Sequence, residues 1–443
     1  MVKKSFLIIN LIIFLIIMHQ IQQTEAKNED VTLKFKILDI GSKQIYYSHD
    51  DSTPVVTIDI AFKNAGYALD SDDNLGSTYV LLYLLKKYEF GQDTQKLKNL
   101  IEENGIKLDF SADQENFYIS AKVIKSNLNI LTNILNMFFS TKFSDQKILT
   151  QTKENLLQSY QINLGNAGFL ANIKQQELLF ENSDLNKIPY GTEKTHENIT
   201  LDSLSGLIHD RFATSNMLVS VSGNISQSKV KGFYEDITKD LKQRFSLKYT
   251  SYKNSYTPVS KLYKLPKEQV LIRAYFPSVA KKNNNFYQYY IANYIIGGSG
   301  LNSTLSREIR EKRGLTYSVY SYFDIYNDFS VWVCELSTDK EKYKEAIKVL
   351  KEVFENINKN GFADEEIERA KKYLTGSFNI YFNENEKISS YLQDSMLRGV
   401  SPILIRNRNK IINSYSSEDI NNIAKKFIIP ENISYITVGE INP

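Results

Sequence analysis

The sequence predicts an α+β protein made of two homologous sheet-plus-helices domains that face each other across a central chamber. Short alternating or β-branched segments, typical of strands, are mixed with helical segments of ten or more residues. The order of these segments in the first half of the chain recurs in the second half, as in an internal duplication. The spacing recurs as well, because Phe143 precedes Asn216 by 73 positions and Phe362 precedes Asn432 by 70. Two such units would enclose a concave space, where ligands usually bind.

Residues 1–26 have the features of a secretory signal peptide. Lys3 and Lys4 precede an apolar block, 6–18, that only Asn10 interrupts, and small residues flank a cleavage site after Ala26. The block is short for a bilayer span, and an uncleaved amino-terminal anchor is the alternative. Together with a composition rich in Lys, Asn and Ile, this segment predicts a periplasmic or secreted protein.

The overall composition favours a globular protein and excludes some function classes. The 443 residues are 42% hydrophobic, which is enough for sizeable cores, and the net charge of +3 gives no reason to expect nucleic-acid binding. Cys334 is the only cysteine, so we expect no intramolecular disulfide. No later run of about twenty apolar residues occurs, so we expect no membrane contact after signal cleavage.

The first half contains eight clear elements. They are a strand at Val55–Phe62, helices at Asn74–Lys87 and Gln95–Asn104, a strand at Phe117–Val123, a helix at Asn127–Phe139, a long helix after Phe143, a helix at Asp202–Phe212 and a strand at Asn216–Gly223. Gly105 follows the second helix, as a glycine that ends a helix would.

The second half repeats this order. Its predicted elements are a strand at Gln269–Phe276, helices at Phe286–Ile296 and Leu305–Arg313, strands beginning at Leu315 and at Phe329, a helix at Lys340–Asn356, a long helix after Phe362, a helix at Glu418–Phe427 and a strand at Asn432–Gly439. We therefore divide the chain into a signal peptide at 1–26, a first domain at 27–228, a linker at 229–262 and a second domain at 263–443.

The second half carries the most specific motif, in the segment Gly297–Tyr320. Gly297, Gly298 and Ser299 precede a charged helix that Gly314 ends, and an aromatic, β-branched strand follows. Arg310 lies in the last helical turn, and Tyr317 lies seven residues later, so a helix folded back on its own strand would bring both side chains to one place. Taken alone, Arg310 reads as a solvated surface charge and Tyr317 as a core residue.

Comparison of the halves favours a function for this pair. When Gly105 is aligned with Gly314, Ile101 stands opposite Arg310 and Leu108 opposite Tyr317. The polar pair therefore occurs only in the second copy, whereas a shared scaffold role would place polar residues in both.

At its first helix the chain resembles the insulinase/pitrilysin (inverzincin) metallopeptidase family, and the resemblance covers nearly all of the chain after residue 26. That family carries His-x-x-Glu-His in this helix, with two zinc ligands and a general base. Here Tyr79, Leu82 and Tyr83 occupy those places, and Gln158 and Ser159 lie where the third ligand is expected. We therefore expect no metal site, a conclusion that the unpaired histidines also support.

The same resemblance implies roles for residues of the second half. The run from Gly297 to Tyr317 is close to the family's second-domain motif, so Arg310 and Tyr317 are expected to bind the peptide carbonyl, and Gly297, Gly298 and Ser299 to contact substrate. Some bacterial members divide the work between two chains, of which only one carries zinc. The sequence thus indicates a subunit without zinc that acts on peptides together with a zinc-bearing partner. The alternative is a non-catalytic peptide-binding or assembly protein on the same fold.

Overall fold

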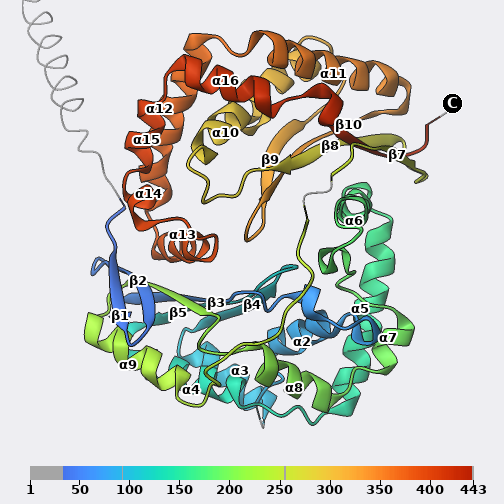
Figure 1. The fold of residues 1–443 in the computed structure, drawn as a ribbon. Helices are drawn as coiled ribbons and strands as arrows, with labels where there is room; N and C mark the ends of the chain where they lie inside the picture. Colours follow the sequence, from blue (N-terminus) through green and yellow to red (C-terminus); the bar gives the residue numbers. More distant parts are fainter. Residues whose placement is uncertain (1–32, 92, 254–255, 442–443) are drawn as a thin grey trace, which may run out of the picture.

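A computed structural model describes residues 33–91, 93–253 and 256–441; the predicted signal peptide lies outside these residues. Figure 1 shows two layered halves, each a mixed sheet covered by helices on its outer side. The first sheet has six strands in the order β1-β2-β6-β3-β5-β4, and the second has five in the order β7-β11-β8-β10-β9. The predicted α+β class and the two-half arrangement are confirmed.

The strand bounds follow the sequence pattern closely. The first sheet consists of β1 (Lys36–Ile40), β2 (Lys43–His49), β3 (Val55–Phe62), β4 (Lys107–Ala112), β5 (Phe117–Ile124) and β6 (Met217–Gly223). The second consists of β7 (Ser260–Tyr263), β8 (Gln269–Ser278), β9 (Val319–Ile325), β10 (Ser330–Asp339) and β11 (Ser434–Val438). β1, β2, β4 and β7 were not expected from the sequence.

The duplication extends to the topology of the sheets. In each half the closing strand, β6 or β11, lies antiparallel to the first long strand and parallel to a neighbour from earlier in the chain. In each half an edge strand, β4 or β9, forms an antiparallel pair with the strand that follows it. The two sheets are therefore built to one plan, with an extra strand at the edge of the first.

Most of the helices cover the outer face of a sheet and build its core. The first half contains α2 (Ser77–Lys86), α3 (Thr94–Glu103), α4 (Leu128–Phe139), α5 (Gln146–Leu164), α6 (Ala167–Leu179), α7 (Glu193–Glu197) and α8 (Leu201–Arg211). The second contains α10 (Phe286–Asn293), α11 (Tyr343–Asn360), α12 (Asp364–Tyr381), α13 (Asn385–Leu397), α14 (Pro402–Arg406), α15 (Arg408–Ser414) and α16 (Ser417–Phe427). Trp332 and Cys334 of the central strand β10 are fully buried in the second core.

One helix of each half packs against the sheet of the other half, and we call these two helices, α6 and α13, the lent helices. After the long helix α5, α6 packs its apolar residues against the second sheet, where Ala171 and Leu179 contact the cluster that contains Tyr275. After the long helix α12, α13 packs against the first sheet, and Ser220 of β6 donates a 2.8 Å hydrogen bond to the Ser389 carbonyl. Both helices lie between the sheets (Figure 1).

Parts of the predicted linker 229–262 belong to the two halves: a helix packs in the first, and a strand pairs in the second. Its helix, α9 (Gln227–Thr238), packs Val230, Phe233 and Ile237 into the first core, and β7 pairs with β11 in the second sheet. No helix in the described part of the chain combines the length and apolar character needed to cross a bilayer.

The region around Arg310 differs from the expected geometry. The predicted α-helix at Leu305–Arg313 contains a π-helical stretch, Ser306–Glu311, and α10 likewise continues into a π-helical stretch at Tyr294–Gly298. The following strand begins at Val319, four residues later than expected. In a segment this short, the spacing of apolar residues does not distinguish an α-helix from a π-helix. Both kinds of helix place a stripe of apolar side chains on the core.

Candidate functional site

The glycine-rich segment packs directly on the edge strand β9. A Cβ atom at Gly297 would come within 2.6 Å of the Ser321 backbone nitrogen, so only glycine fits without a shift. Asn293 fixes the same contact, because its Oδ1 accepts hydrogen bonds from Ser321 Oγ (2.7 Å) and from Trp332 Nε1 (2.8 Å). Gly297 is therefore explained by packing against β9.

The other two residues of the predicted substrate-binding segment are more accessible. Gly298 is exposed, and Ser299 lines a surface pocket of about 640 Å³ with Arg307, Glu311 and Tyr373. Neither Arg310 nor Tyr317 is among the residues that line this pocket. The structure therefore separates the Ser299 pocket from the predicted pair, and substrate contact by Gly297, Gly298 and Ser299 stays a prediction.

The backbone between Arg310 and Tyr317 is held firmly. Gly314 adopts a φ of +59°, and its N–H donates to the Arg310 carbonyl (2.9 Å), so it ends the helix as expected. Thr316 Oγ1 then donates to the Ser337 carbonyl of β10 (2.6 Å), and the Ser318 N–H donates to Thr316 Oγ1 (3.2 Å). Thr316 is thus attached to the sheet, and Ser318 is attached to Thr316.

The side chains of Arg310 and Tyr317 are partly or largely accessible to solvent. Tyr317 is 81% exposed, which contradicts a core role, and Arg310 is half-buried. Within the described residues neither side chain takes part in a hydrogen bond or ion pair, and the structure brings them into no contact with each other. Tyr317 therefore presents its phenol to solvent from a fixed backbone.

In the first half, aromatic rings occupy the place of the expected metal helix residues. Tyr79 of α2 meets Tyr67 edge-on at 5.8 Å and Tyr190 at 5.2 Å, and burial raises its pKa above the ordinary tyrosine value. Leu82 is buried in the first core, and Tyr83 packs against it. Oxygen and nitrogen donors suited to zinc are not gathered here, and Tyr79 instead fills the site with ring contacts.

The third expected ligand place is also without a carboxylate. Gln158 is exposed on α5, and the Ser159 hydroxyl donates to the Asn155 carbonyl of its own helix (2.7 Å). In the ranges that the structure describes, no three His, Cys, Asp or Glu side chains form a group that could hold a metal ion. The residues present therefore do not fit a family-type zinc site.

A buried ion pair holds the start of α2. Asp70 accepts hydrogen bonds from the N–H groups of Gly76 and Thr78 (3.2 Å each) and from Thr78 Oγ1 (2.6 Å). Arg211 of α8 donates to the same carboxylate at 2.8 Å, and both charged side chains are almost completely buried. The orientation of α2 is thus kept although its metal ligands are lost.

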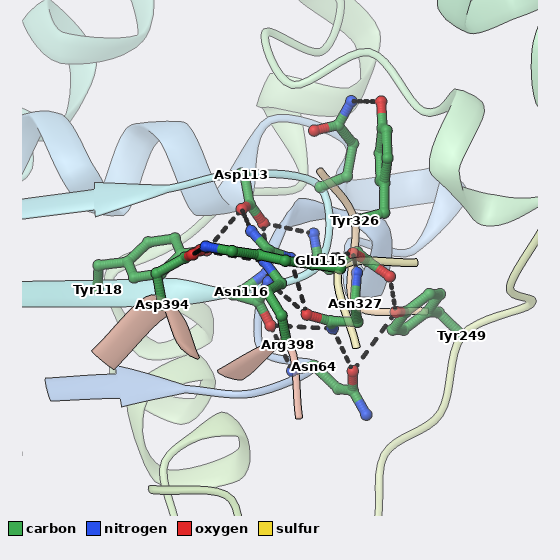
Figure 2. Close-up of polar contacts among 12 residues, drawn as sticks. Asn64, Asp113, Glu115, Asn116, Tyr118, Tyr249, Tyr326, Asn327, Asp394 and Arg398 are labelled. Carbon is green, nitrogen blue, oxygen red and sulfur yellow. Dashed lines mark hydrogen bonds and ion pairs between the residues drawn. The ribbon is translucent and has the colours of Figure 1, made fainter. Parts of the chain in front are cut away.

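The two halves meet at a polar junction, which we define as Asp113, Glu115, Asn116, Asn327 and Arg398. Figure 2 shows that the β4–β5 turn, the β9–β10 turn and the end of α13 converge here. Asn116 and Asn327 exchange two hydrogen bonds of 3.1 Å, and Arg398 donates to Asn327 Oδ1 at 3.0 Å. No periodic pattern in the sequence marks this junction, because its residues lie in turns and at the end of a helix.

Glu115 is the most perturbed acid of the polar junction. It is 4% exposed, accepts hydrogen bonds from the Asn327 N–H (2.6 Å) and the Tyr249 hydroxyl (2.8 Å), and lies 3.7 Å from Arg398. Burial raises its pKa to about 7, and the hydrogen bonds and Arg398 only partly oppose this effect. The protonation of Glu115 therefore changes near neutral pH.

A second charged network lies on the inner face of the second sheet, next to the lent helix α6. Arg273 of β8 pairs with Glu335 of β10 and also donates to Asn172 of α6. The Tyr320 hydroxyl of β9 donates to Glu335 at 2.7 Å. Polar residues at alternate strand positions are the signal that could have identified this face, because they interrupt otherwise apolar strands.

The architecture is a duplicated sheet-and-helix unit, and known proteins share it. A family model described as the peptidase M16 inactive domain matches residues 198–374. A Bacillus subtilis protein named uncharacterized zinc protease YmxG is 24% identical over 359 residues, 79% of this chain and 85% of that protein. A Helicobacter pylori protein named non-peptidase homolog YmxG is 23% identical over 352 residues, 79% and 80% of the two chains.

Solved structures show the same fold. The crystal structure of a peptidase M16 inactive domain from Pseudomonas fluorescens superposes with a TM-score of 0.85 at 19% identity, over 93% of this chain and 98% of that chain. A chain of complex III2 from Candida albicans reaches 0.73 at 16% identity, over 92% and 96%. The resemblance to the insulinase/pitrilysin family is thus confirmed: residues 198–374 match the peptidase M16 inactive domain, and nearly the whole chain shares the fold of the solved structures.

Proposed function

We propose that this chain is the non-zinc subunit of a periplasmic heterodimeric zinc endopeptidase and supplies Arg310 and Tyr317 to a peptide held at the partner's zinc. One observation carries the proposal. Ile101 and Leu108, the counterparts of the pair in the first half, are buried core residues, whereas Arg310 is half-buried and Tyr317 is 81% exposed. An exposed phenol and a half-buried guanidinium seven residues apart, present in one copy only, suit contact with a substrate.

The chemistry assigned to the pair is electrostatic. The Arg310 guanidinium has only hydrogen-bond donors, the Tyr317 hydroxyl can donate one hydrogen bond, and a peptide carbonyl gains negative charge as it is attacked. A well-placed donor to such an oxygen is worth about 2.7–4 kcal/mol of transition-state stabilisation. Zinc in the partner would supply the activated water, because the described residues of this chain include no group of side chains that could hold the metal.

The fixed backbone around Tyr317 supports this role. The hydrogen bonds of Thr316 and Ser318 hold the backbone on both sides of Tyr317, so only the side chain of Tyr317 would have to be ordered when a substrate arrives. Gly297 contributes indirectly, because its lack of a side chain lets the preceding segment lie on β9 beside Ser321.

Co-purification tests the proposal. The full-length chain, expressed with an affinity tag in its own host, should retain an M16 chain that carries His-x-x-Glu-His, and the complex should contain one zinc per heterodimer and cleave an unfolded peptide. The isolated chain should show neither zinc nor cleavage. Recovery of a homodimer that binds zinc by itself, or of a complex without a zinc-bearing M16 chain, would contradict the proposal.

The second candidate function is a non-catalytic peptide-binding or assembly protein. The aromatic contacts of Tyr79 favour it, since packed rings occupy the position where the family has its first zinc ligand. The similarity in fold to a chain of complex III2 favours it as well. A gene for a His-x-x-Glu-His M16 protein next to the gene of this chain favours the endopeptidase, and its absence from the genome favours the assembly protein.

A further inference from the structure

A second pocket lies within the helical layer of the second half, apart from Arg310 and Tyr317. It has a volume of about 540 Å³ and is lined by residues of α10, α12, α13 and α15. Most of the lining is aromatic and includes Tyr287, Phe378, Tyr381 and Tyr391. The lining contains no Asp or Glu, but it contains Arg408 and Lys281. We call it the Arg408 pocket.

Arg408 is a buried cation without an anionic partner. Its residue is only 6% exposed, and its Nη1 donates to two neutral acceptors, the Leu374 carbonyl (3.1 Å) and Asn409 Oδ1 (2.9 Å). Among the described residues, no carboxylate lies within ion-pair distance of it. Buried charges are normally paired, so this guanidinium is an unusual feature of a protein interior.

Aromatic rings surround the Arg408 guanidinium. Its central carbon lies 4.1 Å from the ring centre of Phe378, 5.7 Å from Tyr287 and 6.0 Å from Tyr290. Contact with ring faces stabilises a cation in part, and it leaves the remaining N–H edge available for an anion. Lys281, the other cation of the pocket, is already paired with Asp394.

The corresponding long helix of the first half carries a different set of ring contacts. Tyr160 and Phe378 are each the fifteenth residue of their long helix, α5 and α12. Tyr160 stacks on Tyr190 at 4.9 Å and meets Phe169 at 6.0 Å, and within the described residues no cation lies over these rings. The buried guanidinium is therefore a property of the second half and not of the duplicated scaffold.

We propose that the Arg408 pocket binds a carboxylate attached to an aromatic or large aliphatic group. The carboxylate pairs with the free N–H edge of Arg408, whose burial strengthens a charge-assisted hydrogen bond. The apolar part stacks among the rings of Tyr287, Phe378 and Tyr391. Tyr381, which is 52% exposed, lies at the rim. A free aromatic acid and the C-terminal residue of a peptide share this chemistry.

Calorimetric titration of the full chain with N-acetylphenylalanine and with its neutral amide tests the charge requirement. The acid should bind at least about tenfold more tightly than the amide. Arg408→Gln should remove this preference and leave the weak amide binding unchanged. Arg406→Gln is the matched control, since this neighbouring guanidinium contacts Phe35 outside the pocket. Equal affinities for acid and amide, or no binding of either, would overturn the proposal.

A second variant keeps the test decisive if loss of the Leu374 contact unfolds Arg408→Gln. Tyr381→Ala removes a half-exposed rim side chain, should leave the melting temperature nearly unchanged, and should weaken acid binding severalfold. Unchanged binding in a folded Tyr381→Ala would overturn the assignment of the pocket.

The peptide acetyl-Ala-Ala-Phe distinguishes the two sources of the carboxylate. Tighter binding than that of N-acetylphenylalanine supports a peptide C-terminus, and equal or weaker binding supports a free acid. The outcome is independent of the endopeptidase proposal.

Discussion

Asn116 and Asn327 exchange two side-chain hydrogen bonds of 3.1 Å across the junction between the halves. The first residue lies in the β4–β5 turn and the second in the β9–β10 turn, so corresponding hairpins of the duplicated unit meet tip to tip (Figure 2). Both amides are buried. This reciprocal pair, together with the lent helices α6 and α13, fixes how one half sits on the other.

The amide pair should show strong coupling between its two members. Asn116→Ala and Asn327→Ala should each lower the free energy of unfolding by about 1–3 kcal/mol, since each leaves a buried amide without its partner. The double variant should lose less than the sum, with a coupling of about 1 kcal/mol or more. Urea unfolding of the four proteins measures this. Additive losses would show that the two amides do not depend on each other.

Stability should depend on pH through Glu115. Its pKa is raised by burial to about 7 from an ordinary value of 4.5, so the folded state holds a proton that the unfolded state has released between these values. The contribution of Glu115 is therefore complete below about pH 4.5 and is lost as pH rises through 7, with a total on the order of 1–3 kcal/mol. Urea unfolding at several pH values should show this slope, and Glu115→Gln should flatten it. An unchanged slope in that variant would assign the effect to other groups.

The ion pair at the start of α2 should be essential for stability. Asp70→Asn keeps the shape of the side chain but leaves Arg211 buried and unpaired, which should cost about 3–5 kcal/mol. Asp72→Asn is the matched control: its side chain is 92% exposed and lies 3.9 Å from Lys187, so its loss should change the free energy of unfolding by less than about 1 kcal/mol. Similar effects of the two substitutions would contradict the role given to Asp70.

Gly297 should tolerate no side chain. Gly297→Ala places a Cβ atom 2.6 Å from the Ser321 backbone nitrogen and should destabilise the protein by about 1–3 kcal/mol. Gly376→Ala serves as the control, because no atom lies within 4 Å of its would-be Cβ in the middle of α12, and alanine should stabilise that helix by about 0.5–1 kcal/mol. Thermal unfolding compares the two. A neutral Gly297→Ala would mean that the glycine serves flexibility and not packing.

Sequence patterns predicted the elements of the fold better than their contacts. The bounds of β3 were predicted to the residue, and those of β5 and α4 within one residue, because strong apolar periodicity and flanking turn residues define them. The exchange of α6 and α13 could not be predicted, since an amphipathic helix does not specify which of two sheets it covers. β1 and β2 are short or mixed in pattern and were missed for that reason.

For the site, the sequence identified individual residues but not their surroundings. The loss of the metal helix residues was evident from Tyr79, Leu82 and Tyr83 alone. The exposure of Tyr317 and the ring contacts of Tyr79 required the three-dimensional arrangement, because strand-like aromatic residues are usually buried. The polar junction and the Arg408 pocket were missed, since both combine residues that lie far apart in the chain and carry no local spacing signal.

The value of kcat/KM for peptide cleavage by the purified heterodimer tests the central claim most directly. Arg310→Ala combined with Tyr317→Phe should lower it at least about 10²-fold while the heterodimer and its zinc content stay intact. Lys312→Ala and Tyr320→Phe, which change residues two and three positions away from Arg310 and Tyr317, should cleave at close to the wild-type rate. Unchanged kcat/KM in the Arg310 and Tyr317 variant would contradict the claim that this chain completes the active site of its partner.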